Sequence, residues 1–251
     1  MPFCKTVCLL FWMAAGLSRR PPASQMTRRL MNSTLVRSLA GAALGVAFCL
    51  AGLAAETAAP VAPDVALTRL IDGNKRFVAG AATHPDQSVD VRTQLAQGQH
   101  PFAIVLACAD SRLSPEIIFD QGLGDLFVIR NAGNLLDDHV LGSIEYAVEH
   151  LHTTLIVVLG HTKCGAVTAA VAGGEVPGHL PSIVESLAGA VTMAKKKPGD
   201  PVDNAVRINA KLSAAALDQM EPIIGEAVKA GRVKVVAARY DVTTGQVDLL
   251  P

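Results

Sequence analysis

The distribution of apolar residues along the chain predicts an α/β fold. Short apolar runs alternate with longer segments in which apolar residues recur at helical spacing. A short, nearly continuous apolar run is typical of a strand buried on both faces, and strands that alternate with helices form mostly parallel sheets. We expect four such strands, at residues 102–107, 126–129, 154–160 and 233–239.

Two helices and an edge strand add to this mostly parallel central sheet. Residues 65–78 form an amphipathic pattern, and a second helix is expected over residues 140–151, with Asp138 as its N-cap. Near the C-terminus, Thr244 and Gly245 separate two short runs within residues 240–250. This pattern predicts a hairpin that adds an antiparallel edge strand to a sheet flanked by helices.

Chemically reactive side chains follow the first and third predicted strands. Cys108 and Asp110 come after the first, and His161 and Cys164 come after the third. Ligands bind at this end of the strands in open α/β sheets. Two thiolates and an imidazole make a three-ligand zinc site, whose fourth position is left for water or a nearby carboxylate, as in catalytic zinc sites.

Two other readings of these cysteines have to be weighed. A buried cysteine is often only a small apolar side chain, and two cysteines in an exported domain would normally suggest a disulfide. However, His161 and Cys164 are three residues apart, a spacing that places both on one face of a turn, and Gly160 and Gly165 flank them. The pattern therefore favours a metal site.

From about residue 67 to residue 250, the chain resembles the β-class carbonic anhydrases. The family's motifs occur here in order and at matching separations, which makes the resemblance specific. The matching segments are residues 72–77 (DGNKRF), 107–112 (ACADSR), 127–134 (FVIRNAGN), 143–148 (SIEYAV) and 160–165 (GHTKCG).

The resemblance implies zinc-dependent, reversible hydration of carbon dioxide to bicarbonate and a proton by zinc-bound hydroxide. It implies one Zn²⁺ per chain, with Cys108, His161 and Cys164 as ligands and Asp110 and Arg112 as the catalytic pair. In a closed, inactive state of the family, Asp110 would instead become the fourth ligand. One subclass of the family also closes when bicarbonate fills a second pocket, which is formed in part by a tryptophan three residues before the first cysteine ligand.

The residue at that tryptophan position is Val105, and the only tryptophan, Trp12, lies far outside the predicted domain. This difference favours the open subclass, in which water is the fourth ligand. Substrate contacts also carry over from the family, and Gln99 is expected to reach the site of a partner subunit. The expected substrate-binding residues are Gln99, Phe127, Ala132 and Tyr146, although Phe127 and Tyr146 also fit the pattern of ordinary core residues.

Two alternative functions remain open from the sequence. The same scaffold and ligands serve relatives that hydrolyse carbonyl sulfide or carbon disulfide, and the sequence discriminates poorly between these substrates. A structural zinc domain without activity is the non-enzyme alternative. Asp110 and Arg112 argue against it, because a structural zinc site normally closes with a fourth cysteine or histidine.

Composition limits the partners of the chain. The 251 residues include 22 Lys and Arg and 22 Asp and Glu, so the formal net charge is zero. A basic stripe, typical of nucleic-acid-binding proteins, is missing. We therefore expect no nucleic-acid partner. The resemblance implies carbon dioxide and bicarbonate as ligands and a homodimer or a tetramer of dimers.

The N-terminal part differs from the rest. Arg28, Arg29 and Arg37 precede an uncharged run over residues 38–55, and a Pro- and Ala-rich segment follows. This is the order of an export signal. We expect residues 1–59 to be an export signal and extension, removed or preceding the true start, and residues 60–251 to form one domain.

This segment also suggests where the protein resides. The run is only mildly hydrophobic, so a stable membrane anchor, the alternative reading, is not expected. The Arg28–Arg29 pair suggests the twin-arginine route, and Met26 or Met31 is a candidate true start. We expect a periplasmic or otherwise exported protein.

Overall fold

A computed structural model describes residues 59–251, so nearly all of the predicted export segment lies outside the described residues. Within the described part, no helix combines the length and apolar character needed to cross a membrane.

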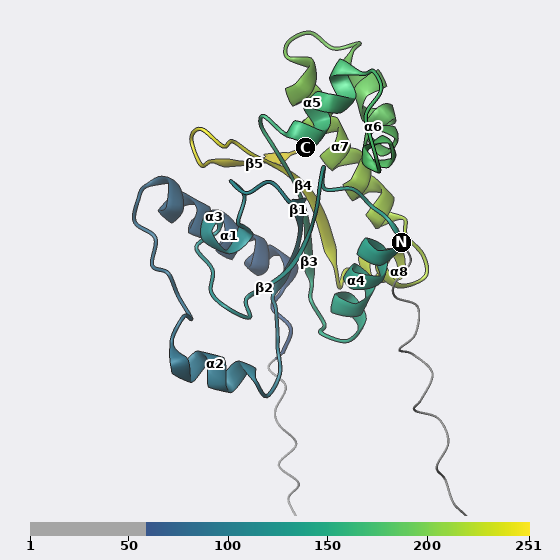
Figure 1. Cartoon of the computed structure of the whole chain (residues 1–251). Coiled ribbons are helices and arrows are strands. Elements are labelled where there is room, and N and C mark those ends of the chain that lie inside the picture. The colour runs from purple at the N-terminus through teal and green to yellow at the C-terminus, as the bar shows by residue number, and fades with distance from the viewer. Residues whose placement is uncertain (1–58) are drawn as a thin grey trace, which may run out of the picture. The chain divides into compact units, whose positions relative to one another are not determined.

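The described residues form a five-stranded sheet with strand order β2-β1-β3-β4-β5 (Figure 1). The first four strands in this order run parallel, and β5 pairs antiparallel with β4. The predicted sheet and its antiparallel edge strand are confirmed, although three of the four predicted strands begin one residue early. The strands are β1 (Ala103–Cys108), β2 (Leu126–Asn131), β3 (Leu155–His161), β4 (Lys234–Tyr240) and β5 (Val247–Leu250).

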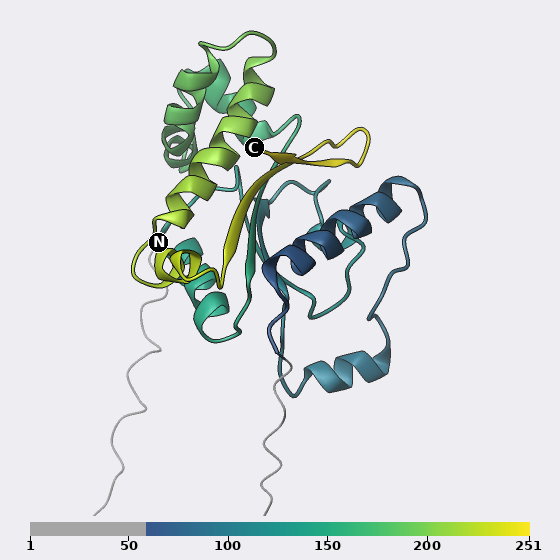
Figure 2. The same cartoon turned by 180° about the vertical axis from the view of Figure 1, so that it is seen from behind.

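Helices cover both faces of the sheet (Figures 1 and 2). Successive residues of a strand point to opposite faces, so Val105 of β1 belongs to one core and Ile104 and Leu106 to the other. The helices are α1 (Pro63–Val78), α2 (Val89–Leu95), α3 (Pro115–Ile118), α4 (Asp138–Glu149), α5 (Gly165–Ala172), α6 (Leu180–Ala194), α7 (Pro201–Asp218) and α8 (Ile223–Lys229).

Each core has its own set of helices. Buried residues of α1, α3, α5 and α6 join the core that contains Val105, and those of α4 and α8 join the core that contains Ile104. Helix α7 contributes its first half to one core and its second half to the other. In contrast, α2 buries no residue and lies apart from the sheet in both views (Figures 1 and 2).

The N-cap of α4 corrects one prediction. Asp137, not Asp138, is the last residue before the helix, and its Oδ1 accepts a hydrogen bond of 2.8 Å from the N–H of Val140. Asp138 is the first helical residue, where its negative charge lies at the positive end of the helix dipole. Because aspartate suits both positions, the sequence pattern does not distinguish them. The helix also ends at Glu149, two residues before the predicted end.

Helix α1 is attached to the sheet by Gly73 and Asn74. A Cβ atom on Gly73 would lie 1.7 Å from the carbonyl oxygen of Phe119, so only glycine allows this close approach. The buried Asn74 amide donates to the carbonyls of Ile118 (3.1 Å) and Gly245 (2.8 Å), and its Oδ1 accepts from the N–H of Val247 (2.9 Å). One side chain thus joins α1, the end of α3 and the β4–β5 hairpin.

Asp120 is a buried carboxylate beside the same helix. Burial by itself raises its pKa, but hydrogen bonds from the N–H of Thr83, the guanidinium of Arg76 and the N–H of His84 hold the pKa well below its usual range. The Arg76 Nε to Asp120 Oδ2 distance is 2.6 Å. Asp120 therefore stabilises the folded chain in its ionised form.

Replacing Asn74 is expected to destabilise the fold. Asn74→Leu leaves two buried carbonyls and one buried N–H without their partner and should lower the free energy of unfolding by about 3 kcal/mol. Lys75→Ala is the control, because Lys75 pairs with Asp72 only at the surface and should change this free energy by less than about 1 kcal/mol. Urea denaturation measures both, and equal effects of the two substitutions would contradict the bridging role of Asn74.

Stability should depend on pH through Asp120. Its folded pKa lies below the unfolded value of about 3.9, so its stabilisation is complete above about pH 5 and is lost as the pH falls below about 4. The unfolding free energy of the unaltered chain should therefore exceed that of Asp120→Asn most at neutral pH, with the difference shrinking toward pH 3. Urea denaturation at several pH values measures this difference.

Asp64→Asn is the matched control, because Asp64 pairs with Lys234 at the exposed surface. Its effect should be small at every pH. A difference between Asp120→Asn and the unaltered chain that stays constant from pH 7 to pH 3 would show that the ionised carboxylate adds no stability.

Candidate metal centre

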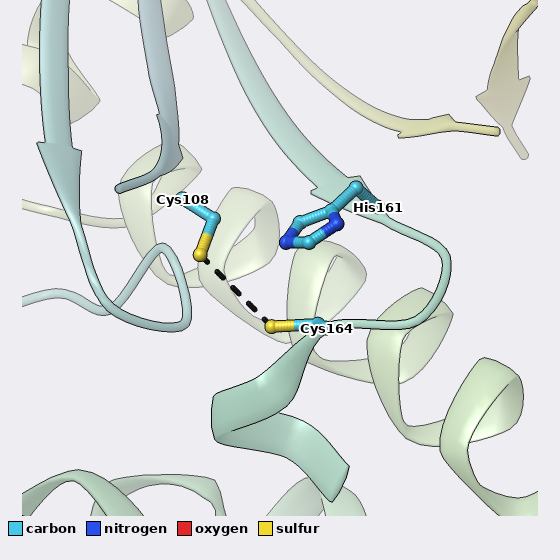
Figure 3. A group of neighbouring side chains, drawn as sticks. All are labelled: Cys108, His161 and Cys164. Atoms are coloured by element: carbon cyan, nitrogen blue, oxygen red, sulfur yellow. Dashed lines mark hydrogen bonds between the residues drawn. The ribbon is translucent and has the colours of Figure 1, made fainter. Parts of the chain in front are cut away.

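Three side chains meet at the carboxyl end of the sheet (Figure 3). Cys108 is the last residue of β1, His161 is the last residue of β3, and Cys164 directly precedes α5. Because β1 and β3 are parallel neighbours, their last residues come together at one edge of the sheet. The two Sγ atoms lie 4.0 Å apart, and all three potential ligand atoms lie within 4.8 Å of one another.

The turn from His161 to Cys164 depends on two local features. Lys163 adopts a left-handed conformation (φ +56°), which redirects the chain so that Cys164 faces back toward His161. Gly160 allows close approach of α7, since a Cβ there would lie 2.8 Å from Cγ1 of Val206. Gly165, the other glycine that flanks the pair, has no neighbour within 4 Å of such a Cβ, so packing requires glycine only at position 160.

The three side chains fit a zinc ion. Nδ1 of His161 lies 2.9 Å from the carbonyl oxygen of Thr162, which can only accept, so Nδ1 donates and Nε2 keeps its lone pair. This buried Nε2 has no hydrogen-bond partner among residues 59–251. Tetrahedral zinc–thiolate bonds would place two sulfur atoms about 3.8 Å apart, close to the observed distance between Cys108 and Cys164.

Both cysteines are free thiols, but their surroundings shift their pKa values in opposite directions. A hydrogen bond from Cys164 lowers the pKa of Cys108, with support from the N–H of Gly133. The same contact, together with burial, raises the pKa of Cys164 far above its usual range. Cys108 is therefore the more acidic thiol of the pair, and the more acidic thiol is the one that more readily gives the thiolate form that binds a cation.

Asp110 lies at the rim of this triad. Arg112 donates from Nε to Oδ1 (2.9 Å), from Nη2 to Oδ2 (2.7 Å) and from its backbone N–H to Oδ1 (3.0 Å). The hydrogen bonds from the Arg112 side chain hold the pKa of Asp110 well below its usual range. Oδ2 of Asp110 also lies 4.0 Å from Nε2 of His161, so this ionised carboxylate borders the place where a metal would bind.

Two residues next to the triad, Arg130 and Gly133, were not assigned a function in the sequence analysis. Arg130 of β2 donates to the carbonyls of Cys108 (3.0 Å) and Asp110 (2.7 Å), and the N–H of Gly133 donates to Sγ of Cys108 (3.4 Å). Both belong to the FVIRNAGN segment at residues 127–134, whose motif was visible in the sequence. The contacts themselves are set by the pairing of β2 with β1.

The expected substrate-binding residues do not gather at the triad of one chain. Ala132 lies in the loop beside it, next to Gly133. Phe127 is paired with Ile104, four residues back from the Cys108–Asn131 pair, or roughly 13 Å along the strand. Tyr146 packs near Phe127, with ring centroids 6.3 Å apart, and is 47% exposed.

Gln99 lies before the start of β1, at the opposite end of this strand from Cys108. It is exposed and lines an open pocket of about 610 Å³ together with residues of α2, among them Arg92 and Leu95. Gln99, Phe127 and Tyr146 are therefore separated from the Cys108, His161 and Cys164 triad of their own chain.

Comparisons with known proteins agree on one family. The carbonic anhydrase family model matches residues 103–247. "Carbonic anhydrase 2" of Mycobacterium tuberculosis is 45% identical over 188 residues, which cover 73% of this chain and 91% of that protein.

Solved structures of β-carbonic anhydrases share the fold. CafA of Aspergillus fumigatus is 30% identical with a TM-score of 0.60, covering 73% of this chain and 90% of that one. A tetrameric β-carbonic anhydrase of Sordaria macrospora is 26% identical with a TM-score of 0.58, covering 73% and 96%. Because the family match spans all four parallel strands and these structural neighbours are β-class proteins, the chain belongs to the β class of the carbonic anhydrase family.

Proposed function

We propose that this protein catalyses the reversible hydration of carbon dioxide to bicarbonate and a proton, with one Zn²⁺ per chain held by Cys108, His161 and Cys164. The observation that carries the proposal is the position of Asp110. Its carboxylate is fixed by Arg112 and borders the triad, 4.0 Å from Nε2 of His161. A structural zinc site, which is closed by four protein ligands, does not need an oriented carboxylate beside the metal.

When bound there, zinc would supply a Lewis acid that lowers the pKa of water and so provides a nucleophile at neutral pH. The protein's part is to orient that nucleophile. Oδ1 of Asp110 already accepts two hydrogen bonds from Arg112, whereas Oδ2 accepts one. The remaining lone pair of Oδ2 is therefore available to accept a hydrogen bond from the nucleophile and so direct its attack on carbon dioxide.

The Asp110–Arg112 pair also supports the open form of the site. Asp110 would have to give up the bonds from the Arg112 side chain before its carboxylate could become a metal ligand. Arg112 is held in turn, since Nη2 also donates to the carbonyl of Lys163 (3.1 Å) on the other ligand loop. Val105, buried in the core, replaces the tryptophan that the closing subclass uses.

The size of the ligand group supports a catalytic rather than a structural zinc site. Among residues 59–251, the cluster of possible ligands contains Cys108, His161 and Cys164, without a fourth cysteine or histidine. Three protein ligands leave one coordination position for water or substrate, whereas structural zinc sites are closed by four.

We further propose that two chains form a homodimer in which each completes the other's substrate pocket. Gln99, Phe127 and Tyr146 lie away from their own triad, and the outer edge of β2 has no neighbouring strand within the described chain. If two β2 edges paired antiparallel, Phe127 of one chain would come level with the Cys108 end of the other. The tetrameric Sordaria relative is consistent with further association of such dimers.

We also propose that the protein is exported. The support comes from the sequence alone: arginines followed by a mildly apolar run and small residues before residue 60. Cell fractionation tests this proposal, and a protein that is found only in the cytosol and keeps its N-terminal segment would contradict it.

The first test is stopped-flow carbon dioxide hydration by the full chain, with zinc content measured on the same sample. We expect activity near neutral pH and about one zinc per chain. Asp110→Asn should keep the zinc but lower kcat at least about 100-fold, because the neutral amide has one acceptor oxygen where the carboxylate has two and cannot serve both Arg112 and the nucleophile. Asp138→Asn, at an exposed carboxylate of α4, is the control and should leave kcat unchanged.

Loss of zinc in Asp110→Asn would instead indicate that Asp110 is a metal ligand in the resting protein. Full activity of this variant would remove Asp110 from the mechanism. A zinc-loaded unaltered chain that hydrolyses carbonyl sulfide or carbon disulfide but does not hydrate carbon dioxide would refute the proposed substrate.

Subunit complementation tests the shared pocket. Cys108→Ser removes a metal ligand and Gln99→Leu removes the amide, so each variant alone should have low activity. In a mixed dimer, one site combines an intact triad with Gln99 from the partner. Co-refolding equal amounts should therefore restore about a quarter of the unaltered activity, because half of the dimers are mixed and each has one complete site. If Gln99 acted within its own chain, mixing would restore nothing.

A further inference from the structure

Asn209 is a buried polar residue on α7 that no step of the proposed mechanism uses. It is 6% exposed and lies among apolar residues of the helix that belong to the two cores. Its Nδ2 donates a hydrogen bond of 3.0 Å to the carbonyl oxygen of Gly133, 76 residues away in the sequence. This bond connects α7 to the loop between β2 and α4.

Gly133 in turn contacts a predicted metal ligand. Its N–H donates to Sγ of Cys108 at 3.4 Å, in a backbone conformation (φ +88°) that favours glycine. The ends of this loop are held by Asn131, whose side chain accepts from the N–H of Leu135 (2.7 Å) and donates to its carbonyl (2.9 Å). Asn209 holds the middle of the loop, where the N–H group that faces the sulfur is located.

Helix α7 also packs against the end of β3, which carries the predicted ligand His161. Val206, one turn before Asn209, and Ala210, the next residue, both pack against Gly160, which directly precedes His161. Residues 206, 209 and 210 lie on one face of the helix by their spacing. A single helix face thus contacts the loop beside Cys108 and the strand end that carries His161.

We propose that Asn209 is a positioning residue of the metal centre, which acts by holding the Gly133 N–H on the sulfur of Cys108. This inference rests on the proposed metal-binding function. A thiolate that accepts an N–H hydrogen bond is a weaker electron donor, so Asn209 indirectly makes Cys108 a less electron-rich ligand. In a site with two thiolates, whose negative charge offsets that of the ion, such a bond preserves the ion's ability to polarise water.

The test uses the full chain loaded with Co²⁺, whose thiolate-to-metal charge-transfer absorption reports the electron donation of the cysteines. Asn209→Leu has a similar size but cannot donate, and Asn209→Ala is a smaller alternative if leucine does not fit. In both, the absorption band should move to longer wavelength, because Cys108 becomes a stronger electron donor. Zinc affinity, measured by competition with a chelator, should fall about tenfold, because the loop that positions Cys108 is no longer held.

Ser213→Ala is the matched control, because Ser213 is also a buried polar residue of α7, one turn after Asn209. It should leave the absorption band and the zinc affinity unchanged. Urea denaturation of all variants separates general destabilisation from an effect on the metal centre, since loss of helix packing alone does not move the band.

An absorption band at the unaltered wavelength in both Asn209 variants would overturn the inference, whatever their stability. Such a result would leave the proposed function intact, because the unaltered chain would still bind metal. If the unaltered chain itself bound neither Co²⁺ nor Zn²⁺, the proposed function would fail, and the role of Asn209 would fail with it.

Discussion

The parallel pairing of β1 with β3 is the constraint on which the metal centre depends. Parallel strands end at the same edge of a sheet, so Cys108 and His161, which are 53 positions apart in sequence, become neighbours. Cys164 needs only the turn at Lys163 to join them. The rigidity of a sheet buried on both faces then holds the ligand atoms at nearly the spacing of a tetrahedral ion before any metal binds.

Around this edge, hydrogen bonds between side chains and backbone groups do most of the positioning. Arg130 binds the carbonyls of Cys108 and Asp110, Arg112 joins Asp110 to the loop of Lys163, and the N–H of Gly133 faces the Cys108 sulfur. Each of these contacts ties one ligand-bearing segment to another. The charge of Asp110 is stabilised in the same network, so orientation and ionisation of the carboxylate have a common cause.

The expected substrate-binding residues, unlike the metal ligands, are not brought together by the fold of one chain. Phe127, which is partly buried, and Tyr146, which is about half exposed, form an aromatic pair on the outer strand β2 and helix α4, and Gln99 lies beside helix α2. Exposed apolar side chains and an unpaired strand edge are costly in water and favour association with another surface. The proposed dimer would satisfy both features at once and would bring these residues to a metal site.

The sequence by itself determined the fold class, the order of the strands along the chain and the three candidate ligands. These depend on local patterns: apolar runs, helical spacing, and reactive residues directly after strands. The tertiary structure alone decided which Asp caps α4, that Lys163 rather than Gly165 adopts the left-handed conformation, and that Gln99 and Phe127 lie far from their own Cys108. It also revealed the link from Asn209 to Gly133. Such features depend on strand register and on contacts between residues distant in sequence, and these appear only when the whole chain is packed.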